Sequence, residues 1–284
     1  MVLLATSSAP AQDLFVAGGY DNSVHVITPS GLQSTFASGL NGAGGLAFDT
    51  AGNLFVTVGG GSINKITPGG SSSTFASGIN APGGLAFNSA GNLFVSDNGS
   101  GDIYEFAPNG TRTTFASGLG NPGALAFDTA GNLFEADGSS GNIYKFTPGG
   151  ARSTFASGLS YPVGLAFNSA GNLFETDFLG GNINEFTPGG LQSTFSSGWL
   201  YPQALAFDNA NDLYLFYGGY LEAAIIKFTP GGGQSTFASG FTVPTTDGLA
   251  FQGIPLPVPE PSTVGLLMIG AAVSLLRRRP HQVR

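Results

Sequence analysis

The chain of 284 residues is long enough for one large domain, and with 46 glycines, 24 phenylalanines and only 9% charged residues it favours short strands joined by tight turns over helices or disorder. Cysteine is absent, which excludes disulfides and thiol chemistry. The net charge is −8 and the few basic residues before residue 252 are scattered, which argues against a nucleic-acid partner because phosphate contacts need clustered Lys and Arg.

The N-terminal segment MVLLATSSAPAQ combines a short apolar run with the small-x-small pattern Ala9-Pro10-Ala11. This pattern resembles a signal-peptidase cleavage site before Gln12, although no positive segment precedes the apolar run. We therefore interpret residues 1–11 as the remnant of a signal peptide, or alternatively as a disordered N-terminus.

Residues 12–251 contain six copies of a sequence repeat of about 40 residues. Three patterns recur at this spacing, namely LF (once LY), LAF and TF. Their aromatic residues are Phe15, Phe55, Phe94, Phe134, Phe174 and Tyr214 for the first pattern, Phe48, Phe87, Phe127, Phe167, Phe207 and Phe251 for the second, and Phe36, Phe75, Phe115, Phe155, Phe195 and Phe237 for the third.

Each unit contains four apolar segments that are too short for helices. A typical unit has GLAFD, the turn TAGN, LFV, a glycine-rich loop, INKIT or IYKFT, the turn PGG and STFASG. Apolar segments of this length, bounded by Gly, Pro, Asn or Asp, are typical of strands and turns. Four strands in each of six units predict an all-β, six-bladed β-propeller with four-stranded blades.

The order of the segments predicts how the ring closes. The chain enters with a second strand at DLFVAGG and leaves with a first strand at GLAF, residues 248–251. The last segment therefore completes the blade that the first one begins, and the N- and C-terminal strands are expected to pair. Such closure removes exposed sheet edges.

The repeat GLAFDTAGNLFVTVGGGSINKITPGG resembles the NHL repeat and the propellers of the gluconolactonase (SMP-30-like) and streptogramin-lyase families. The resemblance covers residues 13–251 and implies the propeller fold. Gluconolactonases of this group use a calcium-type site of Glu, Asn and Asp, and the lyases use a His and acidic residues with magnesium. His25, the one histidine of the repeats, lies on a third strand away from the innermost position, which disfavours a lyase.

Acidic residues gather on one side of the predicted ring. Three successive units end their second strand with Asp, and two of them carry Glu two positions earlier, on the same strand face. Clustered carboxylates are the ligands that a hard cation such as calcium or magnesium prefers. The interpretation we favour is that each Asp accepts hydrogen bonds from backbone N–H groups of the glycine-rich loop that follows. The candidate metal ligands are Asp97, Glu135, Asp137, Glu175 and Asp177.

No catalytic constellation appears in the sequence, because the serines lack a histidine partner at suitable spacing and no GxSxG elbow precedes a helix. Tyr161, Trp199 and Tyr201 fall in loops that lead into first strands. We interpret them as packing residues, with a binding platform on one face of the ring as the alternative.

The C-terminal residues differ from the repeats. The proline-rich stretch 252–261 reads as an extended linker. The uncharged run from Ser262 to Leu276 is shorter than the ~20 residues of a spanning helix, but it ends in an arginine cluster that would stay cytoplasmic. We predict a short transmembrane helix and basic tail over residues 262–284, with Arg277, Arg278 and Arg279 as the stop.

The tail as a whole resembles the PEP-CTERM sorting signal, since Pro259, Glu260 and Pro261 precede a short apolar run and an arginine cluster. The resemblance implies export, transient retention in the inner membrane and processing near these three residues by an exosortase. The product would then reach the cell surface or the extracellular space. A plain C-terminal membrane anchor is the alternative.

Two classes of function follow from these patterns. We favour an exported, non-enzymatic propeller that binds an extracellular polysaccharide or a surface protein, because the repeats are similar and carry no catalytic set. The alternative is a metal-dependent lactonase or hydrolase of the gluconolactonase kind, which would use calcium or magnesium at the acidic cluster. A shared fold does not decide between them.

Overall fold

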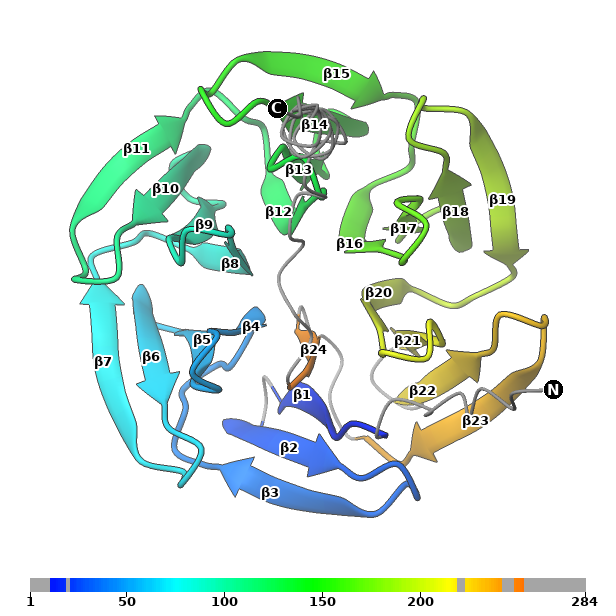
Figure 1. Ribbon diagram of the computed structural model, residues 1–284, viewed down its shortest axis with the longest axis horizontal. Helices are drawn as coiled ribbons and strands as arrows, with labels where there is room; N and C mark the ends of the chain where they lie inside the picture. Colours follow the sequence, from blue (N-terminus) through cyan, green and yellow to red (C-terminus); the bar gives the residue numbers. More distant parts are fainter. Residues whose placement is uncertain (1–10, 19–20, 219–222, 242–247, 253–284) are drawn as a thin grey trace, which may run out of the picture.

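The computed structural model describes residues 11–18, 21–218, 223–241 and 248–252. Within them, 24 strands form six antiparallel four-stranded sheets arranged around a ring (Figure 1). The predicted all-β, six-bladed propeller is confirmed. The short helix expected after residue 261 lies outside the described residues, as do the sorting motif, the arginine cluster and residues 1–10. No helix in the described part is long and apolar enough to cross a membrane.

The first three blades have the following strands, from the innermost to the outermost. Blade 1 is β24 (Leu249–Phe251), β1 (Leu14–Gly18), β2 (Ser23–Ile27) and β3 (Gln33–Ala37). Blade 2 is β4 (Leu46–Phe48), β5 (Leu54–Val58), β6 (Ser62–Ile66) and β7 (Ser72–Ser77). Blade 3 is β8 (Pro82–Phe87), β9 (Leu93–Asp97), β10 (Asp102–Phe106) and β11 (Arg112–Ala116).

The other three blades follow the same order. Blade 4 is β12 (Pro122–Phe127), β13 (Leu133–Asp137), β14 (Asn142–Phe146) and β15 (Arg152–Ala156). Blade 5 is β16 (Pro162–Phe167), β17 (Leu173–Asp177), β18 (Asn182–Phe186) and β19 (Gln192–Ser197). Blade 6 is β20 (Pro202–Phe207), β21 (Leu213–Gly218), β22 (Ala223–Phe228) and β23 (Gln234–Ser239).

The ring closes as predicted, through antiparallel pairing of β24 with β1, in which Phe15 lies opposite Ala250. Gln12 reinforces the closure, because its side-chain amide donates to the Gln252 carbonyl at 2.6 Å and its carbonyl oxygen accepts from the Asn209 amide at 2.9 Å. The entering and leaving ends of the ring are therefore fastened to each other and to blade 6.

The two ends of the ring carry different connections. The turn face carries the reverse turns between first and second strands (residues 49–53, 88–92, 128–132, 168–172 and 208–212) and those between third and fourth strands. The loop face carries the loops between second and third strands and those between successive blades, such as residues 98–101 and 78–81. Because β1 starts and β24 ends at the turn face, the chain enters and leaves the ring there.

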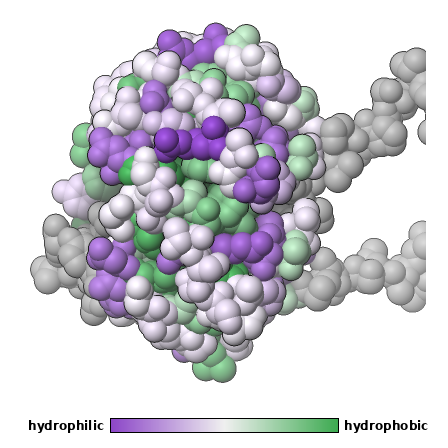
Figure 2. All heavy atoms as spheres, turned by 90° about the vertical axis from the view of Figure 1, so that its left-hand side faces the viewer, coloured by the Kyte–Doolittle hydropathy of each residue, from purple (hydrophilic) through white to green (hydrophobic). Residues whose placement is uncertain are grey.

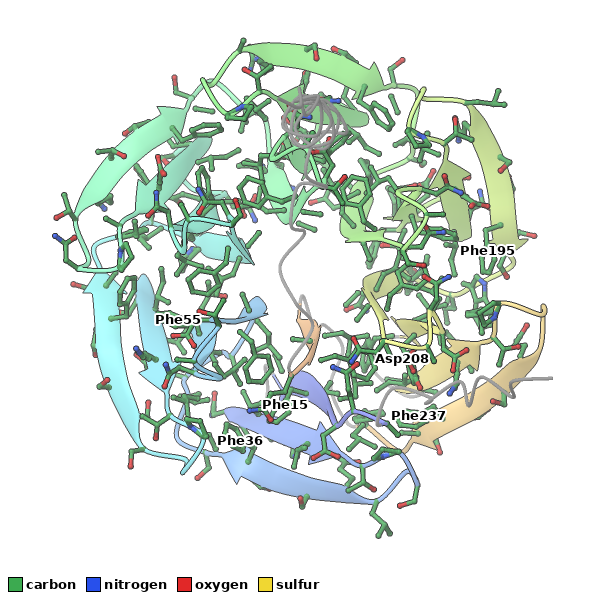
Figure 3. The ribbon with its side chains drawn as sticks, viewed as in Figure 1. Phe15, Phe36, Phe55, Phe195, Asp208 and Phe237 are labelled. Carbon is green, nitrogen blue, oxygen red and sulfur yellow. The ribbon has the colours of Figure 1, made fainter. Side chains whose placement is uncertain are left out.

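Aromatic rings join each blade to the next. The aromatic of every second strand packs edge-on between the Phe of its own fourth strand and the Phe that ends the first strand of the next blade (Figure 3). In blade 1, Phe15 lies 5.0 Å from Phe36 and 4.9 Å from Phe48, measured between ring centroids. The same triad occurs in all six blades, and Tyr214 takes the central place in blade 6.

A β-bulge aims the fourth-strand Phe into these triads. In blade 1, Val24 pairs with Ala37 and His25 pairs with Thr35, so Phe36 is the extra residue of the outer strand. The register shifts at the equivalent position in every other blade. A bulge redirects a side chain without ending the strand, and here it leaves the flanking Ser and Thr exposed. Figure 2 shows hydrophilic and neutral side chains over much of the β7 and β11 side, with a hydrophobic area in the middle of this face.

Charged residues of the turns alternate in type from blade to blade. In blades 2 and 4 the turn begins with Asp, and the third strand supplies Lys65 or Lys145 within 3.7–3.8 Å of the Asp carboxylate. In blades 3 and 5 the turn begins with Asn, and the third strand supplies Glu105 or Glu185, which accepts from the closing turn Asn at 2.7 Å. In each of these four blades, a side chain of the third strand therefore forms an ion pair or a hydrogen bond with the turn between the first and second strands.

Candidate functional site

The three candidate aspartates lie at the loop-face ends of β9, β13 and β17 and bind backbone amides. Asp97 accepts from Asn80 and Ala81 N–H at 3.0 and 2.8 Å and from Gly99 N–H at 3.0 Å. Asp137 and Asp177 make corresponding bonds. The bonds to the following loop agree with the interpretation we favoured. The bonds to the loop that precedes the first strand of the blade were not expected. Each carboxylate therefore accepts hydrogen bonds from two loops and holds them together.

The two candidate glutamates lie inside the protein, in the middle of β13 and β17, and both are 0% exposed. Neither oxygen of Glu135 has a hydrogen-bond partner among the described residues, and Glu175 accepts a single bond there, from the Asn184 amide at 2.9 Å. The corresponding residues of blades 1–3 are the buried valines Val16, Val56 and Val95. Two carboxyl groups thus occupy positions that the repeat otherwise fills with apolar side chains.

Burial raises the pKa of both glutamates. The pKa of Glu135 rises to about 9, because of desolvation first and the neighbouring Asp137 carboxylate second, opposed in part by the Arg152 guanidinium. The pKa of Glu175 rises to about 8, mainly by desolvation, with the Asn184 hydrogen bond opposing it. Both side chains are therefore protonated and neutral at pH 7.

These five residues do not fit a hard cation, which requires several ionised oxygens pointing at one place. The aspartate oxygens already accept backbone N–H groups, and the glutamates are neutral. Among the described residues, no three acidic, histidine or cysteine side chains lie close enough to share a metal ion. The cation site, which was the less favoured interpretation of the sequence, stays untested, and thermal unfolding with and without added cations can test it.

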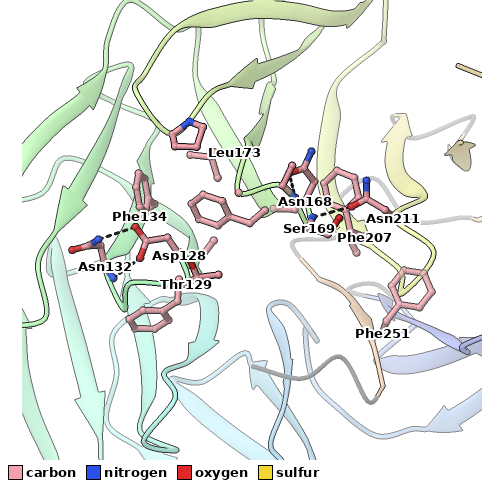
Figure 4. A pocket seen from close by; sticks show the side chains of 18 of the residues that line it. Asp128, Thr129, Asn132, Phe134, Asn168, Ser169, Leu173, Phe207, Asn211 and Phe251 are labelled. Atoms are coloured by element: carbon pink, nitrogen blue, oxygen red, sulfur yellow. Dashed lines mark hydrogen bonds between the residues drawn. The ribbon is translucent and has the colours of Figure 1, made fainter. Parts of the chain in front are cut away.

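A large cavity lies at the opposite end of the ring, on the turn face (Figure 4). Its volume is about 810 Å³, which is within the range of small-molecule sites. The Ala-Phe ends of the first strands line its wall, and the cavity extends between blades 4 and 5 to Phe134 and Leu173. The wall phenylalanines are Phe48, Phe87, Phe127, Phe167, Phe207 and Phe251.

The rim of the cavity is polar, but most of its polar groups bond within the turns. Asp128 accepts from its own turn and from the Asn132 side chain at 2.7 Å, and Lys145 lies 3.8 Å away. The Ser169 amide donates to the Asn211 side chain at 2.9 Å, which joins the turns of blades 5 and 6 (Figure 4). The rim is therefore preformed, and the cavity offers an apolar floor to a ligand.

A second, separate cavity of about 60 Å³ is lined by the Gly or Ala and Leu residues of the first strands. This cavity is small because the first strands approach one another very closely. A Cβ at Gly45 would meet the carbonyl of Gly83 in the next blade, and a Cβ at Gly164 would meet that of Gln203.

This cavity was not predicted from the sequence. The sequence pattern that lines the cavity was visible, because every unit ends its first strand in Ala-Phe. However, the same pattern is also expected of residues that pack between blades. Only the ring places six copies around one axis.

The loop aromatics divide into two groups. Trp199 packs inward, against Tyr217 and Phe228, and its indole N–H donates to the Ser196 hydroxyl at 2.9 Å, so it is a packing residue as we expected. Tyr161 and Tyr201 are 37% and 43% exposed. Phe178, which was not predicted from the sequence, stacks on Tyr201. The two tyrosines are therefore exposed at the surface rather than buried in the core, and a binding platform there stays a prediction.

Residues 257–279 match the PEP-CTERM protein-sorting motif. The fold and this match together define the chain as a six-bladed β-propeller that carries a PEP-CTERM sorting tail. The motif implies an exported, membrane-anchored precursor and processing by an exosortase-type enzyme. A comparison with curated protein sequences found no match.

Solved structures with this architecture include a chain of a nidogen/laminin complex, with 21% identity over 87% of this chain and 99% of that one and a TM-score of 0.76. A gluconolactonase from Xanthomonas campestris has 19% identity over 72% and 79%, with a TM-score of 0.67. Virginiamycin B lyase from Staphylococcus aureus has 17% identity over 81% and 82%, with a TM-score of 0.65. At these identities the similarity shows the fold alone.

Proposed function

We propose that this protein is an exported, non-enzymatic binding protein of the cell surface or extracellular matrix and that the turn-face cavity holds the apolar part of its ligand. The cavity carries this proposal, because it is large, lined by phenylalanine and alanine, and surrounded by a rim whose hydrogen bonds are made within the protein. Such a site binds a ligand by shape and apolar contact.

A bulky residue on the rim should block the cavity. We expect the purified full chain to bind the apolar fluorescent probe anilinonaphthalene sulfonate, and Ser169→Trp to weaken this binding by about tenfold or more. Ser89→Trp is the matched control, because Ser89 occupies the same place in the blade 3 turn but does not line the cavity. Fluorescence titration of the three proteins measures the effect.

Equal probe binding by Ser169→Trp and Ser89→Trp would remove the cavity as the site. Binding screens of the same proteins against glycans and surface proteins then test the wider function. A full chain that binds nothing in either screen would contradict a role as a binding protein.

The second candidate is a metal-dependent lactonase, favoured by the structural similarity to a gluconolactonase propeller and by the five acidic residues of blades 3–5. It requires a cation at the acidic cluster. A cation at a thousand times its dissociation constant would stabilise the fold by about 4 kcal/mol. We expect instead that the thermal midpoint after chelator treatment does not change in millimolar calcium or magnesium, because the aspartates are occupied by backbone amides. A rise of several degrees would support the lactonase and justify assays with lactones.

A further inference from the structure

Three aromatic rings form a row on the loop face of blades 5 and 6. Tyr161 lies in the loop before β16, Phe178 follows β17, and Tyr201 lies in the loop before β20. Phe178 stacks on Tyr201 with centroids 5.0 Å apart and planes inclined by 25°, and it lies 6.0 Å from Tyr161. We call Tyr161, Phe178 and Tyr201 the aromatic row.

The row is open to solvent and carries hydrogen-bonding groups. Both tyrosines are substantially exposed, and so are Leu179 and Leu200, which adjoin the row in the chain. The Tyr161 hydroxyl lies 2.5 Å from the side-chain nitrogen of Asn121. Packing alone does not account for large rings held at the surface, since burial is what stabilises an aromatic side chain.

The backbone at both tyrosines is strained. The φ angles are +71° at Tyr161 and +50° at Tyr201, in the left-handed region that bulky residues avoid. The same loop position holds Gly42 at φ +61° in blade 2, whereas Ala81 in blade 3 and Asn121 in blade 4 have no positive φ. Strain of this kind persists where the surrounding structure enforces it, and it is concentrated at functional positions.

The row faces away from the point where the chain leaves the ring. Gln252 ends the described chain on the turn face, and the seven residues from there to Pro259 span at most about 25 Å. The tether of an anchored precursor would therefore start from the turn face. The loop face and its aromatic row lie at the opposite end of the strands and remain accessible before and after processing.

We propose that the aromatic row is a stacking site for the sugar rings of a neutral hexose polysaccharide. Flat aromatic faces match the C–H faces of a hexose, and the tyrosine hydroxyls and the Asn121 amide can bond its hydroxyl groups. Within the described residues, the row contacts rings and one amide rather than a cationic side chain. The net charge of −8 disfavours an anionic polymer. This site is separate from the turn-face cavity and does not depend on it.

The test is calorimetric titration of the full chain with neutral hexaoses of glucose, galactose, mannose and N-acetylglucosamine. We expect at least one to bind and the double variant Tyr161→Asn/Tyr201→Asn to lose about tenfold or more in affinity. Asn removes the ring but tolerates a positive φ. Leu191→Asn is the control, because it removes an apolar side chain that is even more exposed, at 74%, on the turn face. Ser169→Trp should also bind normally.

Two results would overturn the proposal. One is undiminished sugar binding by the double variant with an unchanged melting temperature. The other is absence of binding to every neutral hexaose at about 10 mM, whether or not a soluble protein partner binds the row. Sugar binding that persists while the cavity probe fails to bind would leave this site intact and remove the cavity instead, so the two proposals fail separately.

Discussion

Replacing Glu135 with valine is expected to stabilise the folded protein, by more as the pH rises. The folded-state pKa is about 9 and the ordinary value is 4.5. Below pH 4.5 the carboxyl is protonated whether the chain is folded or not, so its ionisation costs no stability. Between these values the folded protein holds a proton that the unfolded chain releases, which lowers the free energy of unfolding by about 1.4 kcal/mol per pH unit.

At pH 7 this cost is on the order of 3 kcal/mol. Valine removes it and fits, because Val16, Val56 and Val95 fill the same position in blades 1–3. Denaturant unfolding at pH 5, 7 and 8.5 should show a difference between variant and native protein that widens with pH. Glu135→Gln, which keeps the shape without the charge, should show the same widening. A difference that stays constant across pH would mean that Glu135 is ionised in the folded state.

Replacing Phe134 with alanine is expected to destabilise the ring by about 3–5 kcal/mol. Phe134 is 3% exposed and packs edge-on against Phe155 at 5.0 Å and Phe167 at 5.1 Å, so it contacts both its own outer strand and the next blade. The truncation removes apolar contact on both sides and leaves a cavity at a blade interface. Unfolding in denaturant, followed by circular dichroism, measures the loss.

Phe134→Tyr is the matched control, because blade 6 carries Tyr214 at this place. The Tyr214 hydroxyl donates to Asp208 at 3.3 Å, and blade 4 offers Asp128 at the equivalent turn position. We expect the tyrosine variant to differ little from the native protein. A large loss in both variants would show that the site does not tolerate a hydroxyl and that blade 6 is accommodated differently.

The fold could be predicted because the same pattern of apolar segments and turn residues recurs in every unit of the sequence. Short apolar segments between Gly, Pro, Asn and Asp favour strands at each of 24 places, and the period fixes how many sheets they form. The order of the segments at the chain ends also predicted the pairing of β24 with β1. The bulge at each fourth-strand Phe was not predicted, because it depends on the contact between Phe36 and Phe15 across the blade rather than on local preference.

The candidate site was less predictable. Sequence spacing placed Glu135 and Asp137 on one strand face, but it did not show that the glutamate is buried among apolar neighbours while the aspartate binds loop amides. The cavity depends on six first strands meeting at one axis, and the aromatic row depends on loops from neighbouring blades. By itself the sequence determined the strands, the ring and the sorting tail, because these follow from local pattern and order. Only the tertiary structure decided which carboxyls are neutral and which aromatics are exposed. The reason is that burial and hydrogen bonding between distant residues arise only in the assembled ring.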